Sequence, residues 1–242
     1  MIRVDNVEYI ASKKTPFEKL IIKNANFTVK EGDFLLLCGV SGSGKSTIAN
    51  MLSGIIKPTS GIIRFPNNVK QRNKFLGYLI QNSYKQITKN NVYDELNYGY
   101  KAIYKGNLNK EIVTEIFNSL SFNKSLEDNP LFFSGGEQKM LSLIALFVLR
   151  QKVMILDEPF TFLDQEKQQL LCTYLRNSSS TVILITHDIN RVFDIATGYI
   201  LIEDMIVSRV TPEVFTQMNK NEKFVEYADK QKIDIFLSKG GL

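Results

Sequence analysis

Residues Gly39–Thr47 have the composition and spacing of a phosphate-binding loop. The stretch reads GVSGSGKST, fits the pattern G-x-x-x-x-G-K-[ST], and follows the apolar run Phe34–Cys38. A strand, such a loop and a helix together turn several backbone N–H groups inward and add the helix's positive end. Lys45 can then reach the outer phosphates of a nucleoside triphosphate, and Ser46 can hold magnesium. The candidate contacts are Gly39, Ser41, Gly42, Ser43, Gly44, Lys45, Ser46 and Thr47.

An acidic pair, Asp157 and Glu158, ends the apolar run Val153–Leu156. A parallel sheet would bring both carboxylates to the edge that carries the phosphate loop. Asp157 would support magnesium through its water shell, and Glu158 would polarise the water that attacks the γ-phosphate. Taken alone, the same residues could merely cap the helix that follows.

His187 is the only histidine, and it follows the apolar run Thr181–Ile185 by two positions. A single histidine in a protein is often a structural residue. At the edge of a nucleotide-binding sheet, however, a ring nitrogen could sense the γ-phosphate and orient the attacking water.

A serine and two glycines in the segment Ser134–Gln138 (SGGEQ) precede a strongly apolar helical stretch. The helix would begin with open N–H donors, and such an end favours an anion by about 0.3–1 kcal/mol. The simpler interpretation is a capping box formed by Ser134 and Glu137.

Apolar periodicity predicts the elements that position these groups. Expected strands are Ile2–Tyr9, Leu20–Val29, Gly61–Phe65, Phe75–Ile80, Val153–Leu156 and Thr181–Ile185, with a closing hairpin of Tyr199–Ile202 and Met205–Val210; expected helices run from Lys45 to near Gly54 and over Leu163–Leu175. Short, fully apolar strands that alternate with helices favour a parallel sheet covered on both faces. The first two strands suggest an antiparallel layer beside the nucleotide.

We therefore expect an α/β fold: a phosphate-loop NTPase core with a mostly parallel sheet, an N-terminal antiparallel β layer and an inserted helical subdomain. One domain would span residues 1–242. Residues 1–89 and 151–210 would form the nucleotide-binding core, 90–150 the helical subdomain with the Ser134 segment, and 211–242 a C-terminal helical tail.

Composition fits a globular chain, with 242 residues, 44% hydrophobic and 23% charged. Residues 1–10 do not resemble a signal peptide, and the longest apolar stretch, Met140–Leu149, is about half of what crosses a bilayer. Any membrane role would therefore require a partner. Cys38 and Cys172 are expected to be reduced core residues.

The net charge of +5 is modest, and its densest cluster is Lys70, Arg72 and Lys74. This cluster lacks interleaved aromatic residues, so we expect no nucleic-acid partner. A mildly basic protein is also compatible with the anionic inner surface of a membrane.

In this order, the motifs resemble those of the nucleotide-binding subunit of an ATP-binding cassette (ABC) transporter, from about Ile2 to Val210. Gly39–Thr47 matches the family's phosphate loop (Walker A), Gln81 its Q-loop glutamine, Ser134–Gln138 its signature, Val153–Pro159 its Walker B segment, Asp164 its D-loop aspartate and His187 its switch histidine. The resemblance implies ATP and Mg²⁺ as ligands, and hydrolysis of ATP to ADP and phosphate.

It also implies partners. Two ATPase subunits, identical or different, would hold ATP head to tail. Lys45 of one subunit and Ser134, Gly135 and Gly136 of the other would contact the same nucleotide, and Gln81 would link magnesium to a docked transmembrane transporter subunit. The chain would then lie at the cytoplasmic face of the membrane, attached through that subunit.

A finer resemblance lies in Gln81–Ile87 and Asn91–Gly99. It is similar to the ATPases of energy-coupling factor (ECF) importers, which take up vitamins and transition-metal ions. The chain departs from the wider family at Phe133, where leucine is usual, at Met140, near a frequent arginine, and at Phe160–Phe162, where small residues are common. These changes put pairing at the dimer seam in doubt and could indicate a heterodimer.

The adenine-stacking aromatic is open, because Ala11 occupies the usual place. Tyr9 is the nearest candidate and Phe17 the other. Two other functions remain as alternatives: a nucleotide-gated regulatory module, disfavoured by Glu158 and His187, and a soluble ABC ATPase acting on nucleic acid or ribosomes. The latter usually has a long coiled coil or a second cassette. Neither the transported substrate nor the direction of transport follows from the residues alone.

Overall fold

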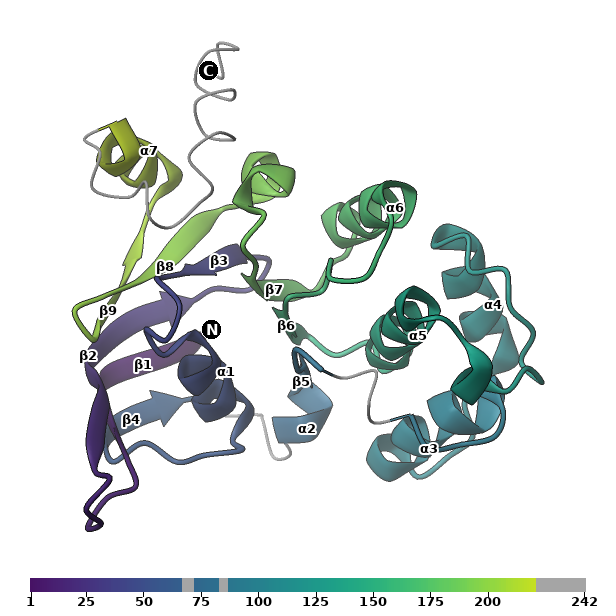
Figure 1. Ribbon diagram of the computed structural model, residues 1–242, viewed down its shortest axis with the longest axis horizontal. Coiled ribbons are helices and arrows are strands. Elements are labelled where there is room, and N and C mark those ends of the chain that lie inside the picture. The colour runs from purple at the N-terminus through teal and green to yellow at the C-terminus, as the bar shows by residue number, and fades with distance from the viewer. Residues whose placement is uncertain (67–71, 83–86, 221–242) are drawn as a thin grey trace. The chain divides into compact units, whose positions relative to one another are not determined.

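The computed structural model describes residues 1–66, 72–82 and 87–220 (Figure 1). The chain forms two compact units, Met1–Arg72 with Thr181–Leu242, and Asn73–Ser180. The first unit contains β1 (Ile2–Ala11), β2 (Lys19–Val29), β3 (Phe34–Cys38), α1 (Lys45–Ser53), β4 (Ser60–Arg64), β7 (Thr181–Ile185), η3 (Ile189–Arg191), η4 (Phe193–Ile195), β8 (Gly198–Glu203), β9 (Ile206–Val210) and α7 (Pro212–Lys220). The short helix α2 (Arg72–Phe75) spans the boundary, and the second unit contains β5 (Leu76–Leu79), α3 (Val92–Tyr104), α4 (Lys110–Ser119), η2 (Pro130–Phe132), α5 (Gly135–Phe147), β6 (Val153–Asp157) and α6 (Gln165–Arg176).

In the first unit the strands follow the order β4-β1-β2-β9-β8-β3-β7. Strands β4, β1 and β2 pair antiparallel, which confirms the predicted antiparallel layer. Strand β3 pairs in parallel with both β7 and β8, and β8 and β9 form the predicted hairpin. Every residue of β3 and β7 is buried, as expected for parallel strands covered on both faces.

Helix α1 begins at Lys45, within the phosphate-loop motif, and ends at Ser53 with Gly54 as its C-cap, which agrees with the predicted end near Gly54. Gly54 adopts a left-handed conformation, and its N–H donates to the carbonyls of Asn50 and Met51. Such a C-cap satisfies carbonyls that the helix itself leaves open. The helix buries Ile48, Ala49, Met51 and Leu52, which anchor it in the core of the first unit.

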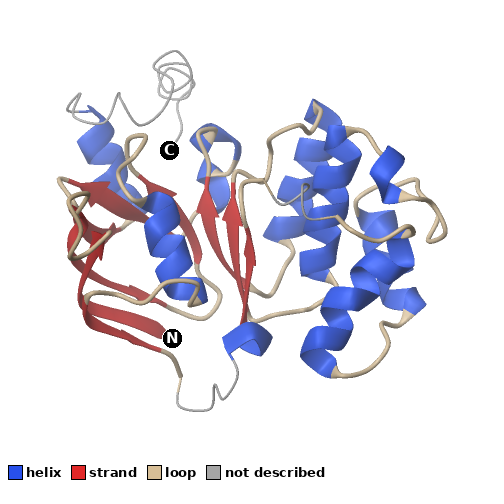
Figure 2. Ribbon diagram, turned by 60° about the horizontal axis from the view of Figure 1, so that its bottom comes forward, coloured by secondary structure: helices blue, strands red, loops and turns tan. Residues whose placement is uncertain are grey.

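In the second unit β5 and β6 pair in parallel, and the helices lie together (Figure 2). The predicted strand at Phe75 was wrong at its first residue, because Phe75 ends α2 and the strand begins at Leu76. The amide of Gln151 donates to the carbonyls of Asn73 and Leu76 and so holds this turn. That contact joins residues far apart in sequence.

The two units meet in sequence at residues 72/73 and 180/181, whereas the predicted division lay at 90 and 150. The difference arises because β5 pairs with β6 and also contacts α5. A helical subdomain over residues 90–150 stays a prediction.

Both cysteines are buried and free, as expected. Burial raises the pKa of the Cys38 thiol to about 12, although Lys45 opposes the shift.

Within the described part of the chain, no helix is both long and apolar enough to span a bilayer. Three predicted features fall partly outside the described residues: Lys70 of the basic cluster, 83–86 of the ECF-like stretch, and 221–242 of the tail. The described part of the tail contains α7, where Phe215 stacks on Tyr199 with ring centroids 3.8 Å apart, and a helical tail over 211–242 stays a prediction.

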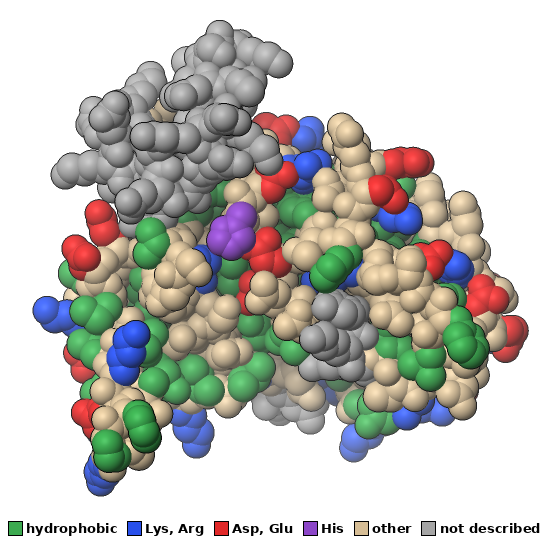
Figure 3. Space-filling model, viewed as in Figure 1, with side chains coloured by type: hydrophobic (Ala, Val, Ile, Leu, Met, Phe, Trp, Pro, Cys, Tyr) green, Lys and Arg blue, Asp and Glu red, His purple; other side chains and the backbone are tan. Residues whose placement is uncertain are grey.

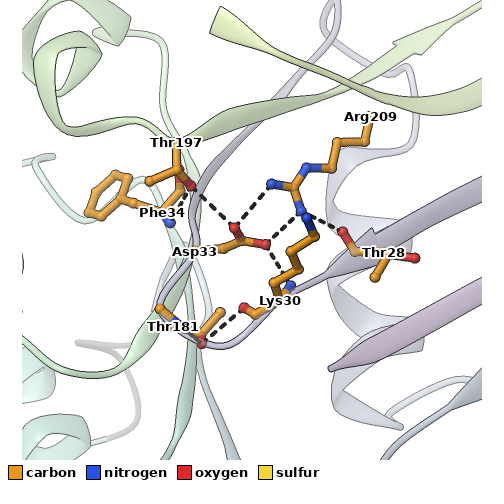
Figure 4. A network of polar contacts seen from close by, with 8 residues as sticks. Thr28, Lys30, Asp33, Phe34, Thr181, Thr197 and Arg209 are labelled. Carbon is orange, nitrogen blue, oxygen red and sulfur yellow. Dashed lines mark hydrogen bonds and ion pairs between the residues drawn. The ribbon is translucent and has the colours of Figure 1, made fainter.

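A buried ion pair ties the start of β3 to β9 (Figure 4). Arg209 donates from Nη1 to Asp33 Oδ2 at 2.6 Å and from Nη2 to Oδ1 at 3.0 Å. Asp33 also accepts from the backbone N–H of Lys30, and Thr197 Oγ1 lies 3.4 Å from its Oδ1. With Asp33 7% exposed, this carboxylate needs those partners to offset its lost hydration.

Asp33→Asn should destabilise the protein, because it leaves the Arg209 guanidinium without a counter-charge. We expect the free energy of unfolding in urea to fall by about 1–3 kcal/mol. The control is Glu115→Gln, which breaks an exposed ion pair to Arg150 and should cost less than about 1 kcal/mol. Equal losses of unfolding free energy in Asp33→Asn and Glu115→Gln would contradict a stabilising role for the Asp33–Arg209 pair.

A capping box begins α5. Ser134 Oγ accepts from the N–H of Glu137, while Glu137 Oε2 accepts from the N–H of Ser134 at 2.7 Å. Lys124 Nζ lies 2.6 Å from Glu137 Oε1. Lys124, followed by the Ser134 N–H, holds the pKa of Glu137 at about 2, compared with its ordinary 4.5.

This depressed pKa predicts a pH dependence of stability. The contribution of Glu137 is present above about pH 4.5 and is lost as pH falls towards 2, because the unfolded chain takes up the proton first. Glu137→Gln should therefore lower the unfolding free energy at pH 7 and flatten its fall between pH 5 and 2.5. Exposed Glu127→Gln serves as control. If the unfolding free energies of wild type and Glu137→Gln fall in parallel as the pH is lowered, the prediction is refuted.

Candidate functional site

The phosphate loop leaves β3 at Gly39 and closes on itself before α1. The N–H of Ser43 donates to the carbonyl of Val40 at 3.1 Å. Gly42 and Gly44 have φ values of 78° and 107°, in the region that residues with a Cβ rarely adopt. Lys45 Nζ donates to the carbonyls of Gly39 at 2.7 Å and Val40 at 3.0 Å, which holds the ammonium inside the curve of the loop.

Close packing also leaves little room for a side chain at two of the loop glycines. A Cβ on Gly39 would collide with Ser43 Oγ, and one on Gly44 would lie 2.9 Å from Ile22 Cδ1. Ser43 Oγ is buried and has no hydrogen-bonding partner among the described residues. A loop with an ammonium, the N-terminus of α1, the hydroxyl of Ser46 and this extra hydroxyl offers the donors that a triphosphate with its magnesium ion requires.

His187 lies at the same edge of the first unit as the loop. Strands β3 and β7 are parallel neighbours with Leu36 opposite Leu184, so Gly39 and His187 both follow their carboxyl ends. The side chain is exposed, and it is the purple residue in Figure 3. Beyond it, Asp188 pairs with Arg191 at 2.9 Å, which fixes the turn that follows.

Of the aromatic candidates, Tyr9 is the better placed. It pairs with Ile22 in the β1–β2 ladder, and directly opposed residues of an antiparallel pair point to one face. Ile22 is also the residue whose side chain approaches Gly44. Phe17 is 82% exposed in the turn between the strands, and Ala11 lies opposite Lys19.

In the second unit, Gln81 and the acidic pair come to one edge. Leu79 of β5 pairs with Leu156 of β6; Gln81 comes two residues after Leu79, and Asp157 and Glu158 come directly after Leu156. Asp157 is 5% exposed, and the Tyr78 hydroxyl donates to its Oδ2 at 3.4 Å. Burial, and then Asp157, raise the pKa of Tyr78, which keeps this hydroxyl protonated. Glu158 has a φ of 49°, an uncommon value for a residue with a side chain.

The signature segment Ser134–Gln138 contacts the D-loop backbone. A Cβ on Gly136 would lie 2.6 Å from the carbonyl oxygen of Phe162, whereas one on Gly135 would meet open space. Asp164 caps α6 by accepting from the N–H of Lys167 at 2.8 Å, and this bond lowers its pKa. The side chains of Asp164 and Phe162 are exposed.

Three of the residues that depart from the ABC pattern, Phe133, Met140 and Phe160, pack against neighbouring side chains or in the core. Phe133 packs edge-on against Phe122, with Lys124 Nζ 4.6 Å from the centre of its ring. Met140 and Phe160 are core residues, 0% and 4% exposed, and Phe162 is 58% exposed.

Sequence reasoning missed Tyr78 and Lys139. Lys139 is fully buried in α5, and its Nζ donates to the carbonyl of Gln81 at 3.3 Å. One signal was available: the residues three and four positions from Lys139 are Gly135, Gly136, Ser142 and Leu143, so no acidic neighbour on the helix could pair with it.

Comparison with known proteins agrees with this organisation. Residues 22–161, more than half of the chain, match the family described as ABC transporter. Energy-coupling factor transporter ATP-binding protein EcfA2 of Thermotoga maritima is 31% identical over 210 residues, which cover 84% of this chain and 79% of the relative. The protein of the same name from Clostridium perfringens is 28% identical over 241 residues, 92% of this chain and 84% of the relative.

Solved structures give the same result. The structure of cbiO1 from Clostridium perfringens, described as part of the ABC transporter complex cbiONQ, covers 98% of each chain with a TM-score of 0.73 and 25% identity. A dimeric ATP-binding cassette in a post-hydrolysis state with ADP and Pi covers 88% of this chain and 99% of its own; its TM-score is 0.74, and at 23% identity it shows the fold alone. This chain therefore belongs to the ABC transporter family, as one of its ATP-binding cassettes.

Proposed function

We propose that this chain binds and hydrolyses ATP, releasing ADP and phosphate, to power a membrane transporter. The observation that carries the proposal is the phosphate loop, with Gly42 and Gly44 in the left-handed region and Lys45 Nζ held against two loop carbonyls. Such a geometry suits a triphosphate. Membership of the ABC transporter family supports transport as the process that the energy of hydrolysis drives.

In this proposal the loop residues Gly39–Thr47 bind the phosphates. Lys45 exchanges its bonds to the loop carbonyls for bonds to phosphate oxygens, which are charged and therefore stronger acceptors. Ser46 is in the first turn of α1, where its hydroxyl can ligate magnesium. Tyr9 stacks on the adenine, supported by its pairing with Ile22 beside Gly44.

The hydrolytic roles fall to Gln81, the acidic pair and His187. Asp157 supports the metal through its water shell, Glu158 accepts a proton from the attacking water, Gln81 helps to ligate the metal, and His187 contacts the γ-phosphate. When bound, Mg²⁺ neutralises charge on the phosphate oxygens. The shared edge of β5 and β6 supports joint action by Gln81 and the acidic pair.

A second cassette, identical or different, completes the site. Ser134, Gly135 and Gly136 would present the N-terminus of α5 to the nucleotide of the partner, with Asp164 beside them in the seam. The dimeric arrangement of a cassette with a similar fold supports this step. The exposed Phe162 is consistent with a seam residue.

We further propose an importer of the ECF type that carries micronutrients, either vitamins or transition-metal ions. Support comes from the names of the relatives and from the ECF-like residues Asn91–Gly99, which lie in α3 and its N-cap. A transmembrane subunit would dock near Gln81 and hold the chain at the cytoplasmic face of the membrane. Nucleic acid has no part in this proposal.

Lys45→Ala should weaken ATP binding by about 10- to 100-fold, because it removes a charged hydrogen-bond donor from the phosphates. Equilibrium dialysis with labelled ATP measures the affinity, and phosphate release measures the rate, which should fall as well. Exposed Lys57→Ala, just beyond α1, is the matched control. Unchanged affinity in Lys45→Ala would overturn the assignment of the loop.

Glu158→Gln should retain ATP binding while turnover falls by about 10²–10⁴-fold, the usual contribution of a general base. ATP should then accumulate a closed dimer, visible as a larger species in size-exclusion chromatography. Exposed Glu166→Gln in α6 should behave as wild type. If Glu158→Gln releases phosphate as fast as wild type, Glu158 is not the base; if wild type binds ATP and releases none, the chain is a nucleotide-gated regulator.

A further inference from the structure

Lys139 is buried completely, which is unusual for a lysine. Removing an ammonium from water costs several kcal/mol unless nearby groups offset the loss. The residues on its own helix do not supply such a group, because its neighbours one turn away are glycine, serine and leucine. The groups that offset the lost hydration of the Lys139 ammonium must therefore come from other segments of the second unit.

Two segments provide it. Nζ donates to the carbonyl of Gln81, just beyond β5, at 3.3 Å, and the negative charges of Asp157 and Glu158, at the end of β6, act on it as well. Burial lowers the pKa of Lys139 to about 8, while both carboxylates oppose that shift. The Lys139 side chain, on α5, thus interacts with the backbone of Gln81 and with the charges of Asp157 and Glu158.

We propose that Lys139 is a positioning residue, which holds Gln81 and the acidic pair in the arrangement that binds magnesium with ATP. This inference rests on the proposed function. Lys139 itself touches neither nucleotide nor metal in this account. It acts through the backbone of Gln81 and through the charge of two carboxylates.

Two physical effects support this role. Adjacent carboxylates such as Asp157 and Glu158 repel each other in a region of low dielectric, and a buried cation reduces that repulsion. The hydrogen bond to the carbonyl of Gln81 also fixes the backbone from which the glutamine side chain extends. Tyr78, which donates to Asp157, holds the same carboxylate from β5.

The neighbouring residue gives a useful contrast. Met140 is equally buried, so an unbranched apolar side chain is accepted in this part of α5. Methionine at position 139 would fill much of the same volume without the charge or the donor. If only packing mattered, Lys139→Met would be nearly neutral.

The test compares ATP affinity with Mg²⁺ and with EDTA, using the purified full chain. Lys139→Met should lose about tenfold in affinity when Mg²⁺ is present and stay within about twofold of wild type in EDTA, where no metal links ATP to Gln81 and the acidic pair. Lys139→Arg, which keeps charge and donors, should restore most of the Mg²⁺-dependent affinity. Exposed Lys152→Met, just before β6, is the control and should match wild type. Lys139→Gln, which keeps a donor without charge, replaces the methionine variant should that one fail to fold.

Equal affinities of Lys139→Met and wild type in both conditions would overturn the inference. So would an equal loss with Mg²⁺ and with EDTA, accompanied by a lower melting temperature and no rescue by arginine, because that pattern describes a general loss of structure. A wild-type chain that binds ATP in neither condition would instead refute the proposed function, and the inference with it.

Discussion

The phosphate loop is the constraint on which the first unit depends. Its backbone enters the left-handed region at Gly42 and Gly44, and a Cβ on Gly39 or Gly44 would force Ser43 or Ile22 to move. A loop this restricted needs rigid supports, which β3 and α1 provide through complete burial and an apolar helix face. Strand β7 then places His187 beside it, and the Asp33–Arg209 pair anchors the opposite end of β3.

Charge burial plays the corresponding part in the second unit. Asp157 and Lys139 are almost or fully removed from solvent, and each is supported by a different segment. Strand β5 contributes the Tyr78 hydroxyl to Asp157, the segment just beyond β5 contributes the carbonyl of Gln81 to Lys139, and α5 contributes the ammonium. Loss of either charge would leave the other buried without compensation. The segments that carry them, β6 and α5, are therefore coupled through electrostatics as well as through packing.

Much of this organisation could be predicted from sequence, because it depends on local patterns. Continuous apolar runs such as Thr181–Ile185 indicated buried strands, and the glycine pattern located the loop. The capping role of Ser134 with Glu137 also followed from spacing alone, and the structure confirms it. The catalytic and ligand-binding roles of the predicted residues stay predictions.

Contacts between residues far apart in sequence could not be predicted. Arg209 meets Asp33 across 176 positions, and the turn before β5 is held by Gln151, so neither pattern is visible in a short window. For Lys139 the sequence offered one indication of an unusual environment, the lack of an acidic neighbour one turn away on its helix. A charged residue beside an apolar run is ordinarily assigned to the surface, yet its long aliphatic stem allows full burial when distant carboxylates are available.

The packing of Phe162 against Gly136 has an entropic consequence. Two backbone segments in such close contact cannot sample their conformations independently, so the freedom lost when both become ordered is smaller than the sum of two separate losses. The absence of a side chain at Gly136 thus lets the carbonyl of Phe162 lie directly against the start of α5.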